Sequence, residues 1–155
     1  MTLLDMAVEK IMQKHAGALG VFVAVALVTA YPPFMSMLDE GLLGAFRYFA
    51  ADSFYYLSVA DHSVGAPFFT FDGTHPTNGF HPLWQIYLER SFSSLAFSAA
   101  EQIQYTAISS VLFVSLGTGL FALALLHLTR RPALALLGSA PGVYYLLMPV
   151  FDPHQ

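Results

Sequence analysis

The residues best suited to chemistry lie in one part of the chain, between Asp52 and Trp84. Asp52 opens the segment Asp52-Ser-Phe-Tyr-Tyr-Leu, and the segment Phe71-Asp-Gly-Thr-His-Pro-Thr-Asn-Gly-Phe-His-Pro-Leu-Trp84 follows it. A carboxylate such as Asp52 can act as a general base, or can help to hold a divalent cation that neutralises a phosphate leaving group. The alternative is that Asp52 caps the helix behind it, because aspartate is a common N-cap.

Two histidines, His75 and His81, bracket a turn that contains Asn78. Imidazoles placed on either side of a turn can orient a phosphate or donate a hydrogen bond to an oxyanion. Trp84 can stack on a sugar or a lipid head group, and interfacial anchoring is its ordinary role. No third ligand has the spacing of a metal site, so no metal ligands are predicted, and a divalent cation at Asp52 stays open. The chain has no cysteine, which excludes a thiol nucleophile.

The elements around these residues are apolar. Hydrophobic residues make up 56% of the chain and charged residues only 10%. Three stretches carry no Asp, Glu, Lys or Arg, namely 15–38, 102–129 and 132–151. Each is close to the roughly 20 residues with which a helix crosses a bilayer. We therefore predict an all-α membrane protein of about three transmembrane helices in contact with membrane lipids, with Gly117 and Gly119 as close-packing positions between helices.

These stretches divide the chain into segments on alternating sides of the membrane. Lys10, Lys14, Arg130 and Arg131 mark the cytoplasmic ends of the spans, because positive residues stay inside. The long loop holds two arginines against seven acids and is predicted to be external. This acidic balance also argues against a nucleic-acid partner. The predicted segments are a cytoplasmic amphipathic segment (1–14), a first span (15–35), an external loop with the motif block (36–101), a second span (102–129), a cytoplasmic turn (130–132), a third span (133–151) and an external tail (152–155).

Proline and glycine predict the ends of the helices. The first span is expected to stop near Pro32-Pro33, because proline interrupts a helix. In the external loop we expect short amphipathic or juxtamembrane helices, one from Asp52 to Val64 and one from Pro82 to about Phe97, on either side of the turn-rich segment 67–80. The third span is expected to be kinked or divided at Pro141-Gly142.

Together the two motif segments resemble the N-terminal part of bacterial polytopic membrane glycosyltransferases of the GT-C superfamily. The similar proteins carry acids and aromatics followed by a Thr-Asn-Gly-(Phe/Tyr)-His-Pro-Leu-Trp block, which here is Thr77–Trp84. The resemblance implies a multi-pass protein of the bacterial inner membrane that takes a sugar from a polyprenyl-phosphate donor at the outer face. It also implies a catalytic role for Asp52 and substrate-binding roles for the residues His75, Asn78, His81 and Trp84.

Two features differ from the similar proteins. Ala51 stands where they have the first of two adjacent acids, and they are usually much longer than 155 residues. Two functions are therefore predicted. One is the N-terminal module of a GT-C-like glycosyltransferase, incomplete as an enzyme by itself. The other is a non-catalytic truncated relative that serves as an accessory transmembrane subunit among other membrane protein subunits.

Overall fold

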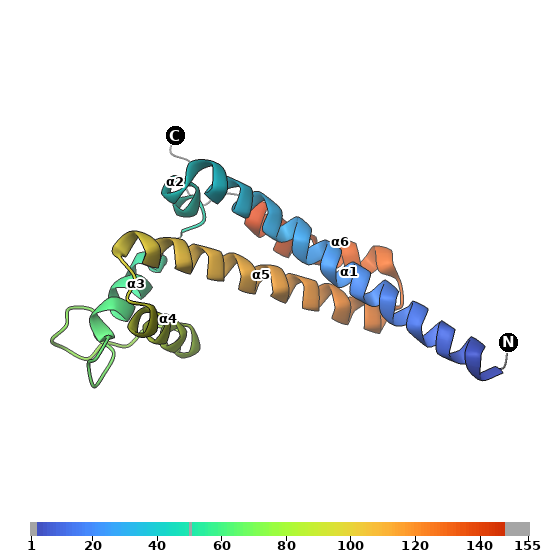
Figure 1. Cartoon of the computed structure of the whole chain (residues 1–155), viewed down its shortest axis with the longest axis horizontal. Coiled ribbons are helices and arrows are strands. Elements are labelled where there is room, and N and C mark those ends of the chain that lie inside the picture. Colours follow the sequence, from blue (N-terminus) through green and yellow to red (C-terminus); the bar gives the residue numbers. More distant parts are fainter. Residues whose placement is uncertain (1–2, 50, 148–155) are drawn as a thin grey trace. The chain divides into compact units, whose positions relative to one another are not determined.

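The computed structural model describes residues 3–49 and 51–147, and the side chains of 16–49 and 52–144. Within these ranges the chain is helical and has no strand (Figure 1). The prediction of an all-α chain is confirmed for the described residues. The helices are α1 (Leu3–Glu40), α2 (Leu42–Phe46), α3 (Ala51–Ser63), α4 (Pro82–Leu95), α5 (Ala99–Thr129) and α6 (Pro132–Leu147).

Two helices are long and apolar enough to cross a membrane, the Ala16–Glu40 part of α1 and the whole of α5. In the most apolar stretch of each, only 17% and 28% of the residues are buried within the chain. The helix α6 has 16 residues, fewer than the roughly 20 of a full span. Residues 148–155 lie outside the described part of the chain, so the third span and the tail stay predictions. The amphipathic face of 1–14 also falls on side chains that are not described.

The end of α1 differs from the prediction, because this helix continues through Pro32 and Pro33 to Glu40. Each proline removes one helical hydrogen bond, but residues 34–40 contain no glycine or further proline that would end the helix. Pro33 itself is fully buried. The first residue suited to end the helix is Gly41, which has a φ of 60°. Glycine adopts this left-handed conformation without steric cost and commonly ends helices.

The described chain forms two compact units, one from 3–35 with 110–147 and one from 36–49 with 51–109. In the first unit, glycines allow the helices to approach. A Cβ on Gly119 of α5 would lie 3.0 Å from the carbonyl oxygen of Phe22 in α1, and one on Gly142 of α6 would lie 2.7 Å from the Thr118 hydroxyl. Gly119 is thus a close-packing position as predicted. Gly117 is not, since a Cβ there meets nothing within 4 Å.

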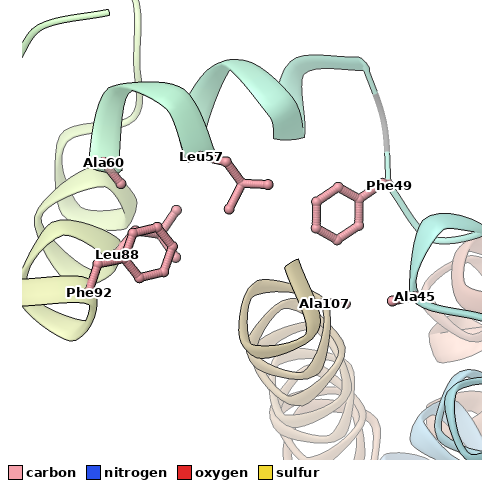
Figure 2. Close-up of a cluster of buried hydrophobic side chains, with 7 residues drawn as sticks. All are labelled: Ala45, Phe49, Leu57, Ala60, Leu88, Phe92 and Ala107. Atoms are coloured by element: carbon pink, nitrogen blue, oxygen red, sulfur yellow. The ribbon is translucent and has the colours of Figure 1, made fainter. Parts of the chain in front are cut away.

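The second unit is built around a buried apolar cluster, drawn in Figure 2. Leu88 and Phe92 of α4 are buried with Gln85, a spacing that places all of them on one face of the helix. Leu88 has no exposed surface, and full burial of a leucine contributes about 1.5–3 kcal/mol. The cluster therefore joins α4 to its neighbours. Its buried members are Ala45, Phe49, Leu57, Ala60, Leu88, Phe92 and Ala107.

The bounds of α3 and α4 lie close to those expected from the sequence. The helix α3 begins and ends one residue before the predicted range and is followed by Gly65, which has a φ of 75°. The helix α4 has Pro82 in its first turn and ends at Leu95, and the left-handed Ala96 caps it. The short helix α2 was not predicted. It contacts the end of α1 through Gly44, where any Cβ would overlap the Ser36 backbone.

The contrast between Gly119 and Gly117 gives a matched test of helix packing in the first unit. Alanine is favoured over glycine in a helix by roughly 1 kcal/mol, so Gly117→Ala should stabilise the chain slightly. Gly119→Ala should destabilise it by about 1–3 kcal/mol because the added methyl group overpacks against Phe22. Unfolding in detergent micelles, followed by circular dichroism, measures both changes. Equal stability of the two variants would contradict the close approach at Gly119.

Candidate functional site

The segment between α3 and α4 folds back along α3 as an ordered loop. At its near end, the Thr70 N–H donates to the Ser63 hydroxyl at 3.0 Å. Its two arms pair, because the Thr77 N–H donates to the Phe69 carbonyl at 2.8 Å and Thr70 forms a bridge with Pro76. The loop is therefore a closed turn with a fixed shape, which we call the 69–81 loop.

The tip of this loop is organised by Asp72. Its Oδ1 accepts the backbone N–H groups of Thr74 and His75, both at 2.8 Å, and its Oδ2 lies 2.8 Å from Nδ1 of His75. The hydrogen bond from the His75 ring, with those from the two backbone N–H groups, holds the pKa of Asp72 well below its usual range. The carboxylate thus fixes the orientation of the His75 ring, whose Nε2 lies outside this contact. The side chain of His75 is 82% exposed.

Two consecutive tyrosines of α3 hold the far end of the loop. The Tyr55 hydroxyl shares a hydrogen bond of 2.9 Å with the Thr77 hydroxyl and donates to the Asn78 carbonyl at 3.0 Å. The Tyr56 hydroxyl accepts the His81 N–H at 3.2 Å. The rings of Tyr56 and His81 also stack, with centroids 6.0 Å apart and planes 10° from parallel. The loop is therefore attached to α3 by side chains on one helical turn.

The predicted substrate-binding residues share this loop or the helix after it. His75, Asn78 and His81 are all exposed. For Asn78, the backbone carbonyl holds the loop. Trp84 lies in the first turn of α4, is half-buried, and stacks on Tyr87 with ring centroids 5.3 Å apart.

Asp52, the predicted catalytic residue, lies in the first turn of α3 and is exposed. Residues three and four apart in a helix share a face, so Asp52 lies on the same side of α3 as Tyr55 and Tyr56. Within the described residues its carboxylate has no hydrogen bond or ion pair. The arrangement combines an exposed acid on α3 with an ordered polar loop held one turn further along the same helix.

A metal ion at this place would need ligands from outside the chain. Among the described residues, no three or more His, Asp or Glu side chains come together as a metal site. Magnesium is often held by one or two carboxylates together with substrate phosphates and water. Asp52 could supply one such carboxylate, and a bound phosphate would supply the rest.

A network of hydrogen-bonded hydroxyl groups joins α4, which carries Trp84, to the start of α5. The Tyr87 hydroxyl lies 2.6 Å from that of Tyr105 and 2.9 Å from that of Ser109, and Ser91 lies 2.9 Å from Tyr105. Burial raises the pKa of Tyr87, so this phenol stays neutral and serves as a hydrogen-bonding group. The ring of Tyr87 connects this network to Trp84.

Several residues that position the site were not predicted from the sequence. The sequence pattern marks Tyr55 and Tyr56 only as aromatic residues of the first motif, and it marks Asp72 only as part of the turn-rich segment 67–80. A local signal for Asp72 exists, because aspartate before glycine often accepts hydrogen bonds from the following backbone N–H groups. The contacts of the tyrosines span more than twenty residues of sequence, and no local pattern reveals them.

A separate cleft of about 370 Å³ lies at the other end of α3. It is lined by Ser63, the aromatic rings of Phe68 and Phe69, and the charged pair Glu89 and Arg90. Ser63 is eleven residues beyond Asp52, or about 16 Å along the helix. This cleft is therefore distinct from the site around Asp52.

Comparisons with protein-family models, with curated proteins and with solved structures give no match to this chain. The functional argument therefore depends on the residues and their geometry.

The clamp at Asp72 makes a testable prediction about pH. A carboxylate with a lowered folded-state pKa contributes stability above the ordinary pKa of about 3.9, and this contribution is lost as the pH falls below that value toward the lowered pKa. The His75 and Thr74 amide resonances should therefore titrate below the ordinary aspartate range in an NMR pH series. A midpoint at the ordinary aspartate value would contradict the clamp.

Two variants separate the bonds of this carboxylate. Asp72→Asn keeps an oxygen that can accept the Thr74 and His75 N–H groups, whereas Asp72→Ala removes every bond. Amide hydrogen exchange at these two residues should accelerate strongly in the alanine variant and little in the asparagine variant. The Thr77 amide, which is bound by the Phe69 carbonyl, serves as the internal control.

Proposed function

We propose that this chain is a membrane-embedded module of a GT-C-type glycosyltransferase that receives a sugar from a polyprenyl-phosphate donor. Membrane placement is supported by the poor burial of its apolar helices. A core helix of a soluble protein is mostly covered, yet only 17% and 28% of the most apolar stretches of α1 and α5 are buried. Leu19, Leu27 and Leu120 each leave more than half of their surface exposed. Lipid around the helices would remove the free-energy cost of exposing this apolar surface to water.

The observation that carries the catalytic part is the exposed carboxylate of Asp52, one helical turn before the tyrosines that anchor the 69–81 loop and without a hydrogen bond or ion pair among the described residues. In the proposed reaction, an acceptor hydroxyl attacks the anomeric carbon of the donor sugar and gives its proton to Asp52. The bond between that carbon and the phosphate oxygen breaks, and polyprenyl phosphate leaves with the electron pair. Atoms and charge balance without any further reactant. In the alternative role, Asp52 would hold a divalent cation in place of accepting the proton, and the cation would neutralise charge on the departing phosphate.

The loop residues take binding roles in this proposal. His75 has Nε2 available, and His81 and Asn78 are exposed on the same loop, so all can face phosphate oxygens. Trp84 offers a partly exposed ring to the sugar or to the first part of the lipid chain. The long apolar chain of the donor would lie in the bilayer, which explains why a membrane module would carry these polar residues. The periplasmic side and the bacterial inner membrane are part of the same proposal.

The test is a transfer assay in native membranes that hold the chain together with its membrane partners, supplied with a polyprenyl-phosphate hexose and a soluble sugar acceptor. General acid–base residues contribute roughly 10²- to 10⁴-fold to rates, so Asp52→Asn should lower turnover by at least that lower factor. The matched control is Asp61→Asn. Asp61 is an exposed acid of the same helix, and asparagine can still accept the 2.7 Å hydrogen bond from Gln102. Unchanged turnover in Asp52→Asn would remove this residue from the mechanism.

Binding can be followed separately, because Trp84 is the single tryptophan of the chain. Its fluorescence should change when the reconstituted chain binds polyprenyl phosphate, and His75→Ala should weaken that binding. Absence of both transfer and binding in the wild-type chain would overturn the proposal. It would favour the other predicted function, an accessory subunit that stabilises a larger membrane complex.

A further inference from the structure

The first unit contains a cavity that the proposed transfer reaction does not use. Its volume is about 290 Å³, and it lies between α1 and the last turns of α5. Gly17 and Ala18 of α1 face Leu123 and Leu126 of α5 across it. We call this space the α1–α5 crevice. A Cβ on Gly17 would meet nothing within 4 Å, so the missing side chain leaves the crevice open. Its walls suit a hydrocarbon chain.

Cationic and polar groups stand at one end of the crevice. His127 and Arg130 line it together with the apolar residues, and both are exposed. Arg131 follows directly and is exposed as well. Within the described residues none of the three forms an ion pair. The crevice therefore has an apolar body and a positively charged mouth.

The backbone at Arg130 has the left-handed conformation that is common where a helix ends. Arg130 ends α5 in the left-handed conformation, with a φ of 57°, and its N–H closes the last turn on the Leu126 carbonyl at 2.9 Å. Glycine or asparagine takes this conformation more easily than arginine.

The first unit carries an excess of positive charge. Its basic residues Lys10, Lys14, Arg130 and Arg131 outnumber the two acids Asp5 and Glu9. Among the segments 16–35 and 110–147, which include the crevice, Arg130 and Arg131 are the only charged residues. Guanidinium groups bind phosphate oxygens in a bidentate manner. Basic pockets between membrane helices are known to hold anionic lipid head groups.

We propose that the α1–α5 crevice binds one anionic phospholipid, with an acyl chain between Gly17, Leu123 and Leu126 and the phosphate on Arg130 and Arg131. The lipid shares only the membrane placement with the proposed transferase. It involves no residue of the site around Asp52. Phospholipid is favoured over free phosphate because the crevice supplies an apolar surface next to the cations, and only a lipid uses both.

Native mass spectrometry of the full chain in detergent tests this assignment with phosphatidylglycerol, phosphatidylcholine and soluble glycerol phosphate. Phosphatidylglycerol should bind as a single copy and more tightly than phosphatidylcholine, and glycerol phosphate should not compete. A cation near an anionic lipid is worth about fivefold in affinity. Arg130→Asn should therefore weaken binding by about that factor, and removing both arginines by about 25-fold. Asparagine suits the left-handed backbone, so the melting temperature should hold or rise.

Crevice shape is tested by a matched pair on α1. Gly17→Leu places a side chain into the crevice and should displace the acyl chain. Gly20→Leu is the control, because a Cβ on Gly20 also meets open space but Gly20 does not line the crevice. Arg90→Gln removes an exposed cation of the other unit and controls for general surface charge.

Equal binding of the two phospholipids, full binding by Arg130→Asn, or an equal loss in Arg90→Gln would overturn the lipid site. Competition by glycerol phosphate would show a free-anion site instead and would also overturn it. Asp52→Asn should leave phosphatidylglycerol binding intact, so the failure of either proposal is visible without the other. A chain that dissolves as a monomer without detergent would remove the membrane placement on which both depend.

Discussion

The loop after α3 keeps its shape because two neighbouring tyrosines reach it from one turn of helix. Tyr55 bonds to Thr77 and to the Asn78 carbonyl, while Tyr56 bonds to the backbone of His81 and stacks on its ring. Each net hydrogen bond contributes only about 1 kcal/mol, but together they fix both the path of the loop and the start of α4. Without these contacts the far end of the loop would lose its attachment to α3, while the near end would keep the bond from the Thr70 N–H to the Ser63 hydroxyl.

The same unit secures α4 by apolar burial and by a polar network. Leu88 and Phe92 close the apolar cluster, and Gln85 donates from its fully buried side chain to the Tyr56 carbonyl at 3.2 Å. The start of α5 is fixed by a capping box, in which Ser98 and Glu101 bond reciprocally. Buried hydroxyl networks are costly when broken, because each unpaired group keeps its desolvation penalty. The residues near Trp84 are therefore held both by these contacts of α4 and α5 and by the 69–81 loop.

The sequence predicts the periodic parts of this chain well. Long stretches without charge predicted the apolar helices, and Pro82 marked where α4 begins, because proline acts through the local backbone. What depends on distant partners could not be predicted. Gly119 packs against α1 whereas Gly117 faces open space, although both occur in the same apolar segment. Only the position of the facing helix decides between them.

For the candidate site, the sequence indicated a segment but not the contacts within it. Of the residues proposed for binding, His75, Asn78 and His81 lie on one loop and Trp84 lies in α4, since the turn signals around Asn78-Gly79 are local. The clamp by Asp72 and the anchors from α3 depend on how the loop folds back, which is a tertiary property. The close approach of Gly44 in α2 to the Ser36 backbone in α1 also depends on tertiary structure. The sequence alone could not predict it.

The path of α1 through its paired prolines has a consequence for the mechanics of that helix. Pro32 and Pro33 lack the N–H groups that would bond to the carbonyl oxygens of Val28 and Thr29. Two successive backbone hydrogen bonds of the helix are thus missing just before the chain passes from one compact unit to the other after Met35. Bending stiffness in a helix comes from these hydrogen bonds, so α1 has its softest point there. A force applied to either end of α1 would concentrate its curvature at this step.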